Sequence, residues 1–222
     1  MLLLLENEIY LWKKFMSIKI RKAEAKDAKF LAEMILQSTR AGKKSGIFDM
    51  IFETTNDEEI LKKLEALTCT EAKNHCHYNN FLIAELDNTS VGTLCSYEPR
   101  IATHKVFMDA LNEVGCADTL DENLKVIYEC DFELNNRTLM FDFMEEKKGF
   151  IDVGVLKALM QKSLLTARLK GYRIAQTVVE IGSMDNILFY KKLGFHKVRE
   201  IECERYKEHF GRAGLVLLAT EF

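Results

Sequence analysis

The sequence predicts one α/β domain in which a mixed, mostly antiparallel central sheet carries helices on both faces. Strand patterns and helical patterns alternate along the chain, which is typical of layered α/β folds. An apolar hairpin in the first half makes part of the sheet antiparallel. No linker or internal repeat divides the 222 residues, and their 48% hydrophobic content is enough for one large core.

The first half is expected to begin with a strand at residues 18–21 and two amphipathic helices at 26–39 and 57–67. In each helix the apolar residues recur at the spacing of a single helical face, so each is expected to bury that face. These residues are Ala28, Leu31, Met34 and Ile35 in the first helix and Ile60, Leu64 and Leu67 in the second.

A hairpin is predicted next, at residues 81–99. Two apolar runs flank Asp87, Asn88 and Thr89, which are turn residues, and Pro99 closes the second strand. Residues 100–136 are interpreted as a helical insert, with one helix at 104–114 and a second helix with a loop in the remainder.

The second half continues as strand, helix, strand, helix and two strands. A strand at 139–144 precedes a helix at 155–170, which Gly171 ends. A β-branched strand from residue 173 breaks at Gly182, and Ser183 supplies a capping hydroxyl for a short helix that carries Tyr190 and ends at Gly194. Strands near 195–202 and 215–220 complete the predicted sheet.

The composition argues against several classes of function. The net charge is −3 and the basic residues lie scattered among acids, which disfavours a nucleic-acid binder. The leucine run near the start is too short to span a membrane, so no membrane partner is expected. We interpret residues 1–15 as an extension outside a domain of residues 16–222, and the first start codon as lying upstream of the domain's own.

The six cysteines lack the dense spacing of a secreted disulfide scaffold, so a reducing, cytoplasmic compartment is expected. One cluster has the residue types of a metal site, namely Cys69, His75, Cys76 and His77. Its spacing suits no zinc motif and a second ligand pair is missing, so no metal is expected.

The carboxy-terminal third carries a motif that resembles a known family. Ser183, Asn186 and Tyr190 have the spacing of the Asn-x-x-Ala-x-x-x-Tyr helix of the GNAT superfamily of acyl-CoA-dependent N-acyltransferases, and Gly194-Phe195 matches its ending. The resemblance implies transfer of an acetyl group from acetyl-CoA to a primary amine of a small molecule or peptide. It also allows a homodimer.

The family's pyrophosphate motif, (Gln/Arg)-x-x-Gly-x-(Gly/Ala), falls on Ile151, Gly154 and Leu156, so one of its three positions is kept. Backbone N–H groups at such a helix start hold the coenzyme pyrophosphate, and Asp152 places a negative charge beside that anion. The coenzyme-binding residues implied by the resemblance are Met144, Glu146, Ile151, Asp152, Val153, Gly154, Val155, Leu156, Ser183 and Asn186.

Tyr190 matches the family tyrosine that acts as general acid toward the departing sulfur. Glu145, Glu146 and Glu180 lie at predicted strand ends facing the expected acceptor cleft, and one of them is expected to serve as base, directly or through water. Backbone N–H groups from Met144 to Glu146 are expected to hold the thioester carbonyl. The alternatives are solvated carboxylates for the three glutamates and a packed aromatic ring for Tyr190.

Further interpretations stay open. With its pyrophosphate motif degenerate at Ile151 and Asp152, the same scaffold also fits a noncatalytic binding or dimerisation module, or an acyltransferase for an unusual acyl donor. The acidic insert at 100–136 fits a cationic acceptor and, equally, a solvated lid.

Overall fold

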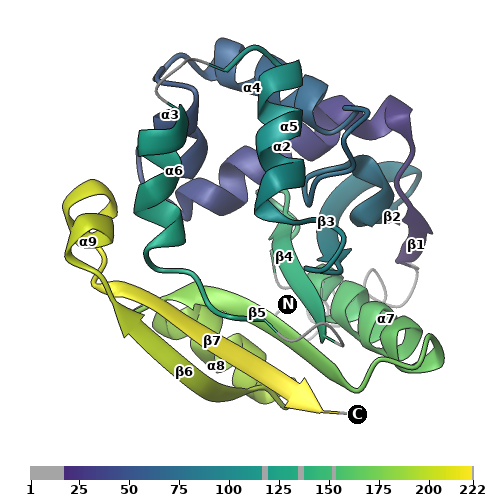
Figure 1. Cartoon of the computed structure of the whole chain (residues 1–222). Coiled ribbons are helices and arrows are strands. Elements are labelled where there is room, and N and C mark those ends of the chain that lie inside the picture. The colour runs from purple at the N-terminus through teal and green to yellow at the C-terminus, as the bar shows by residue number, and fades with distance from the viewer. Residues whose placement is uncertain (1–17, 117–119, 135–137, 152–153, 222) are drawn as a thin grey trace, which may run out of the picture.

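The computed structural model describes residues 18–116, 120–134, 138–151 and 154–221, without the side chains of residues 120 and 121. Figure 1 shows one seven-stranded sheet in the order β1-β2-β3-β4-β5-β7-β6. β4 and β5 are parallel, and the other neighbouring strands pair antiparallel. The predicted mixed, mostly antiparallel sheet is therefore confirmed.

The strands are β1 (Lys19–Lys22), β2 (Phe81–Leu86), β3 (Thr89–Tyr97), β4 (Thr138–Glu146), β5 (Ile174–Glu180), β6 (His196–Glu202) and β7 (Gly214–Glu221). The α-helices are α2 (Ala28–Arg40), α3 (Ile47–Ile51), α4 (Asp57–Leu67), α5 (His104–Glu113), α6 (Leu120–Tyr128), α7 (Val155–Leu169), α8 (Met184–Lys192) and α9 (Glu204–Phe210), with 3-10 turns at Ala25–Asp27 and Tyr78–Asn80. The predicted elements are present, and the sequence prediction missed α3 and α9. With five and seven residues, these two helices are too short to show a helical period.

The β2–β3 hairpin turns at Asp87 and Asn88, whose φ angles of 48° and 62° lie in the left-handed region. Both central residues of a type I′ turn need a positive φ, and Asn and Asp tolerate it better than most residues. The local sequence therefore favours the tight turn that pairs β2 with β3.

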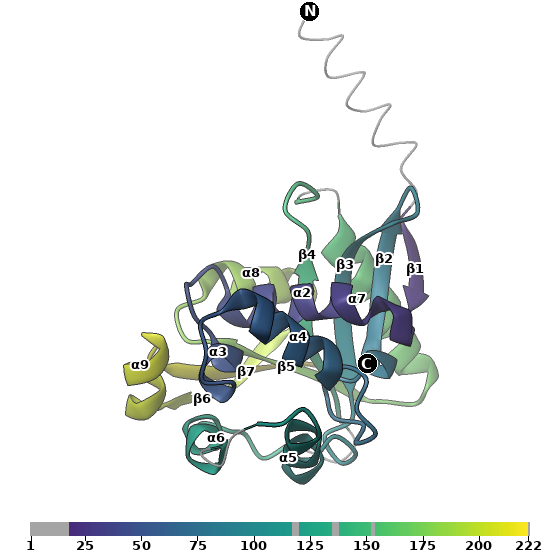
Figure 2. The same cartoon turned by 90° about the horizontal axis from the view of Figure 1, so that it is seen from above.

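Helices cover both faces of the sheet, and Figure 2 shows α7 and α2 on opposite sides of β3 and β4. The apolar core accordingly forms two clusters. The cluster under α2, α3, α4, α5 and α6 includes Leu31, Ile35, Phe48, Ile60, Leu64, Phe81, Phe107 and Leu124. The cluster under α7 and α8 includes Leu94, Phe141, Val155, Leu159, Met160, Val179 and Tyr190.

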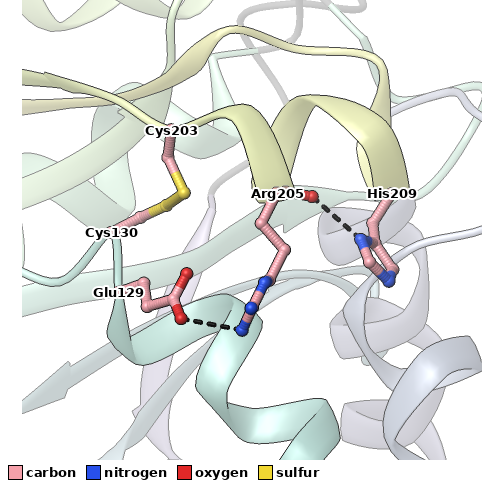
Figure 3. The surroundings of a disulfide bond; sticks show 5 residues. All are labelled: Glu129, Cys130, Cys203, Arg205 and His209. Atoms are coloured by element: carbon pink, nitrogen blue, oxygen red, sulfur yellow. Dashed lines mark hydrogen bonds and ion pairs between the residues drawn. A yellow bond between two sulfur atoms is a disulfide. The ribbon is translucent and has the colours of Figure 1, made fainter.

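The insert packs on the first cluster through Phe107, Ala110, Leu111 and Leu124. Just after α6, Cys130 of the insert forms a disulfide with Cys203, which lies between β6 and α9 (Figure 3). Reduced cysteines were expected from their scattered spacing, and this pair corrects that expectation. The partners are 73 residues apart, so their pairing depends on the fold and not on local spacing.

Candidate active site

β4 and β5 separate in the middle of the sheet. They pair from Thr138–Ile174 to Phe141–Thr177, after which β4 continues beside β3 and β5 beside β7. The β3–β4 register shifts at the same level, and Phe143 has a φ of 43°, unusual for a residue other than glycine. A backbone irregularity of this kind, next to two diverging strands, is typical of a functional site.

Asp142 is the first residue of β4 beyond the parallel pairing. Its Oδ1 accepts a 2.7 Å hydrogen bond from the backbone N–H of Phe143. Burial raises the pKa of the Asp142 carboxyl to about 6, although the Phe143 N–H lowers part of that shift. Among the described residues it forms no ion pair, yet its side chain keeps some solvent-accessible surface. It can therefore exchange a proton near neutral pH.

The side chains around Asp142 are aromatic or thiol groups. Cys95 lies opposite it on β3, and the Asp142 charge helps to raise the pKa values of the Cys95 thiol and the Tyr97 hydroxyl, after the larger effect of burial. The His75 ring lies 5.6 Å from Tyr97 and 4.4 Å from Phe107, between ring centroids. Burial lowers the pKa of His75 to about 4, so this ring is neutral at physiological pH and does not compensate the carboxylate.

Tyr190 approaches the same level from the α8 side of the sheet. Its side chain is 5% exposed and packs edge-on against Phe195, and Thr177 of β5 donates a 3.4 Å hydrogen bond to its hydroxyl. Burial raises the pKa of Tyr190 to about 12, with a smaller contribution from Asp142. The hydroxyl therefore stays protonated at neutral pH, and its own proton is not used in the bond with Thr177.

Glu180 ends β5 and is held by three partners. Its Oε1 accepts hydrogen bonds from the Lys43 ammonium (2.5 Å) and the Tyr206 hydroxyl (3.1 Å), and Arg212 lies 3.5 Å from its Oε2. Lys43 follows α2, Tyr206 belongs to α9, and Arg212 precedes β7. The carboxylate that was predicted as a possible base therefore connects three segments.

Glu145, Glu146 and Met144 form the end of β4. Burial raises the pKa of Glu145, and this shift is reduced by the N–H of Glu146, which donates to Glu145 Oε1 at 3.1 Å, and by the side chain of Gln37. Gln37 also donates to the Glu146 carbonyl at 3.0 Å, which ties α2 to this strand end. The predicted carbonyl-binding segment is therefore fixed from the α2 side.

The α7 N-terminus lies beside the same strand end. Gly154, with a φ of 92°, precedes the helix, and the first turn contains no acidic side chain. A Cβ at Gly92 of β3 would come within 2.6 Å of Val155 and 3.0 Å of the Glu145 carbonyl, so only glycine lets α7 begin this close to β4. First-turn N–H groups have no partner within the helix and favour anions. The donors fit a pyrophosphate.

The remaining predicted coenzyme residues are distributed as follows. Val155 is fully buried, Leu156 is half-buried, and Ile151 is 64% exposed. Asp152 and Val153 lie outside the described residues.

Ser183 and Asn186 lie at the start of α8. Ser183 makes no side-chain capping bond, contrary to the predicted hydroxyl cap, and its N–H donates to the Glu180 carbonyl at 3.1 Å. Asn186 is exposed. The motif that they share with Tyr190 thus begins on the surface and ends in the core.

The acids of the insert are largely matched by local partners. Asp109 pairs with Lys105, Glu129 with Arg205 and Asp131 with His104. Glu113 accepts the backbone N–H groups of Glu71 and Ala72, and Glu122 pairs with Lys125. These pairings favour the solvated-lid interpretation over a surface that attracts cationic acceptors.

A cavity of about 240 Å³ lies at the opposite end of β4, between the second half of α7 and the ends of β1, β2 and β3. Ser163, Lys170 and Glu98 are among its lining residues, and no predicted site residue is. In the part of the chain that the structure describes, no group of three or more His, Cys, Asp or Glu side chains could hold a metal ion. No helix within the described ranges is long and apolar enough to cross a membrane.

Two residues of the site were missed from the sequence, Asp142 and Thr177. Asp142 is the one charged residue within the run LMFDFM, and a carboxylate inside an otherwise apolar strand is itself a signal of function. Thr177 in a β-branched strand carries no comparable signal.

Solved acetyltransferase structures share this architecture. The N-acetyltransferase from Staphylococcus aureus Mu50 matches with a TM-score of 0.68 at 16% identity, over 91% of this chain and 100% of that chain. PaiA N-acetyltransferase from Thermoplasma acidophilum, in complex with coenzyme A, matches with 0.53 at 17%, over 93% and 100%. An acetyltransferase of the GNAT family from Streptococcus pneumoniae matches with 0.53 at 17%, over 93% and 99%.

No protein-family model and no curated protein sequence matches the chain. The structural matches nevertheless cover more than nine tenths of the chain, with TM-scores between 0.53 and 0.68. The chain has the fold of GNAT acetyltransferases.

Proposed function

We propose that this protein transfers an acetyl group from acetyl-CoA to a primary amine, with Asp142 as the base and Tyr190 as the acid. The observation that carries the proposal is the placement of a desolvated carboxyl and a protonated tyrosine where β4 and β5 separate. The GNAT fold adds support, because solved structures with this fold include acetyltransferases.

Asp142 takes the proton that the amine must lose. At neutral pH the amine arrives largely as an ammonium ion, and a carboxylate with a pKa of about 6 is mostly ionised and ready to accept a proton, directly or through water. Burial of this carboxyl keeps its pKa near the working pH. Glu145, also desolvated, is proposed to pass the proton toward solvent.

The end of β4 stabilises the charge that develops on the thioester oxygen. The proposed donors are backbone N–H groups near Met144, in a segment that Gln37 fixes through the Glu146 carbonyl. Tyr190 donates its proton to the departing sulfur, and Thr177 keeps the Tyr190 hydroxyl in place. Glu180 positions the acceptor side through Lys43, Arg212 and Tyr206.

The residues that would hold the coenzyme are the first-turn N–H groups of α7, with Gly154 and Ile151 at its entry and Ser183 and Asn186 on α8. Acetyl-CoA supplies the activated acyl group as a thioester. The predicted repulsion from Asp152 remains part of the proposal, so we expect modest coenzyme affinity.

The test combines binding with turnover. Acetyl-CoA is titrated into the full chain by calorimetry, and thiol release is measured with a panel of primary amines. We expect saturable binding and amine-dependent thiol release, with Gly92→Ala weakening the binding because it displaces Val155. No binding of acetyl-CoA or CoA would refute the proposal and favour the noncatalytic module.

A further inference from the structure

One covalent bond connects the insert to the carboxy-terminal strands. Cys130 follows α6, which packs on the core of the first half, and Cys203 precedes α9, which leads into β7. Their Cα atoms are 6.1 Å apart, a usual separation for a disulfide. α6 and α9 lie side by side in Figures 1 and 3, although they are far apart in the sequence.

A surface ion pair also connects the segment after α6 with α9. Arg205 of α9 pairs with Glu129 at 2.7 Å, and both side chains are nearly half exposed. Surface ion pairs of this kind are screened by solvent and contribute little to stability. His209 contacts the Arg205 carbonyl within α9 itself and adds nothing between the two segments (Figure 3). This ion pair therefore adds little to the covalent constraint that the disulfide places on the two segments.

α9 in turn reaches the end of β5. Tyr206 donates to Glu180, its ring lies 4.7 Å from that of Phe210, and the Lys43 ammonium lies 5.8 Å from the centre of the Phe210 ring. Because Glu180 ends β5, beyond the point where this strand leaves β4, the position of α9 affects this strand end, the proposed acceptor side. The α7 N-terminus lies on the other face of the sheet.

The other cysteines of the chain remain thiols. Cys69, Cys76, Cys95 and Cys116 are free, and two of them are buried. A protein with mostly unpaired cysteines is typical of a reducing environment, where an isolated disulfide is more often exchangeable than structural. Cys203 is half-buried whereas Cys130 is fully buried, so an external thiolate can approach Cys203.

We propose that the Cys130–Cys203 bond is a redox-controlled clasp, which holds α9 and the end of β5 against the insert and is opened by a dithiol reductant. One thiolate of the reductant attacks Cys203 Sγ, and Cys130 leaves as a thiolate and takes up a proton. The second thiol of the reductant then displaces Cys203, which leaves as a thiol. Two electrons and two protons pass to the protein, and the reductant becomes a disulfide.

Opening the clasp loosens α9 and the end of β5 with Glu180, where the amine is proposed to bind. It leaves the α7 N-terminus, where the coenzyme is proposed to bind, in place. As a statement about regulation, this inference rests on the proposed function, but its structural part does not. Amide hydrogen exchange follows α9 directly, whether or not the protein turns over a substrate.

The experiment uses the full chain, oxidised or treated with dithiothreitol, and a Cys130→Ser/Cys203→Ser double variant. Cys69→Ser, at a free exposed cysteine, is the matched control. Alkylation and mass spectrometry count the thiols in each sample.

After reduction we expect amide exchange in α9 to rise about tenfold more than in the first turns of α7. We expect the KM for the amine to rise about fivefold or more while the acetyl-CoA affinity stays unchanged. The double variant should behave like the reduced chain, and Cys69→Ser like the oxidised chain.

Three results would overturn the inference: a disulfide that dithiothreitol cannot reduce in the folded protein, equal exchange increases in α9 and α7, or unchanged exchange in α9. If exchange changes as expected but no acetyl-CoA binds, the clasp stands and the proposed function fails. If acetyl-CoA binds and turnover occurs without any redox effect on amide exchange in α9, the proposed function stands and the clasp fails.

Discussion

Asp142 and Glu180 lie on the two strands that separate at the candidate site, and their environments are opposite. Glu180 is in contact with two cations and a tyrosine hydroxyl. Asp142 has no cation partner among the described residues, and burial raises its pKa to about 6. The sequence analysis selected Glu180 as a candidate base and overlooked Asp142.

The difference teaches that position at a strand end does not by itself make a carboxylate reactive. Desolvation moves the pKa of a carboxyl toward the working pH, whereas a carboxylate that accepts bonds from several segments serves mainly to join them. Glu180 is therefore suited to hold segments together, and Asp142 to move a proton. Each prediction that follows tests one side of this contrast.

The largest effect is expected from Asp142→Asn. If Asp142 is the base, turnover with a primary amine should fall by about 10²–10⁴-fold, with acetyl-CoA affinity nearly unchanged. Steady-state rates and calorimetry measure the two quantities. Glu180→Gln is the matched control, because it also replaces one carboxylate by an amide, and it should cost less than about tenfold in turnover. Equal losses in both variants would remove the contrast.

Tyr190→Phe should give the next largest effect. Loss of the hydroxyl should lower turnover by about tenfold to a thousandfold without weakening coenzyme binding, as expected for a group that acts in the transition state. Because the ring stays packed against Phe195, the melting temperature should change little. Unchanged turnover would reduce Tyr190 to a core aromatic residue.

Glu180→Gln should lower the free energy of unfolding. The amide keeps a partner for Tyr206 but leaves Lys43 and Arg212 without their anion, which should cost about 1–2 kcal/mol of unfolding free energy. Denaturant unfolding at neutral pH measures this loss. A variant as stable as the parent would mean that the three-partner arrangement contributes nothing.

Asp142→Asn should act on stability in the opposite direction. The raised pKa means that the folded protein binds more protons than the unfolded chain between about pH 4 and pH 6, so the stability contributed by Asp142 falls as the pH rises through that range. At pH 7 the variant should therefore be more stable by about 1–2 kcal/mol, and at pH 4 the two proteins should be alike. A variant that is less stable at pH 7 would contradict the desolvated environment.

The fold could be predicted from the sequence because the apolar spacing in α2, α4 and α7 and the turn at Asp87-Asn88 are local signals. Tyr190 was located because its helix carries a recognisable motif. Asp142 was missed because the strand LMFDFM was read only as a strand, although a lone carboxylate within it could have indicated the site.

Other features depend on contacts that a single sequence does not contain. The two cations and the tyrosine hydroxyl around Glu180 come from segments distant from it in the sequence, and Cys130 and Cys203 meet only when the insert folds against α9. Gly92 could be predicted in part. A glycine inside a strand indicates a close approach, but only the structure identifies Val155 as its neighbour.

The pH dependence of acetyl transfer tests the central claim most directly. The rate with saturating acetyl-CoA and a primary amine should rise with pH to a plateau, with a midpoint near pH 6 set by Asp142. Glu180→Gln should keep this midpoint, and Asp142→Asn should lose it along with most of the rate. A profile without a transition near pH 6 in the parent protein, or one that persists in Asp142→Asn, would contradict the assignment of Asp142 as the base.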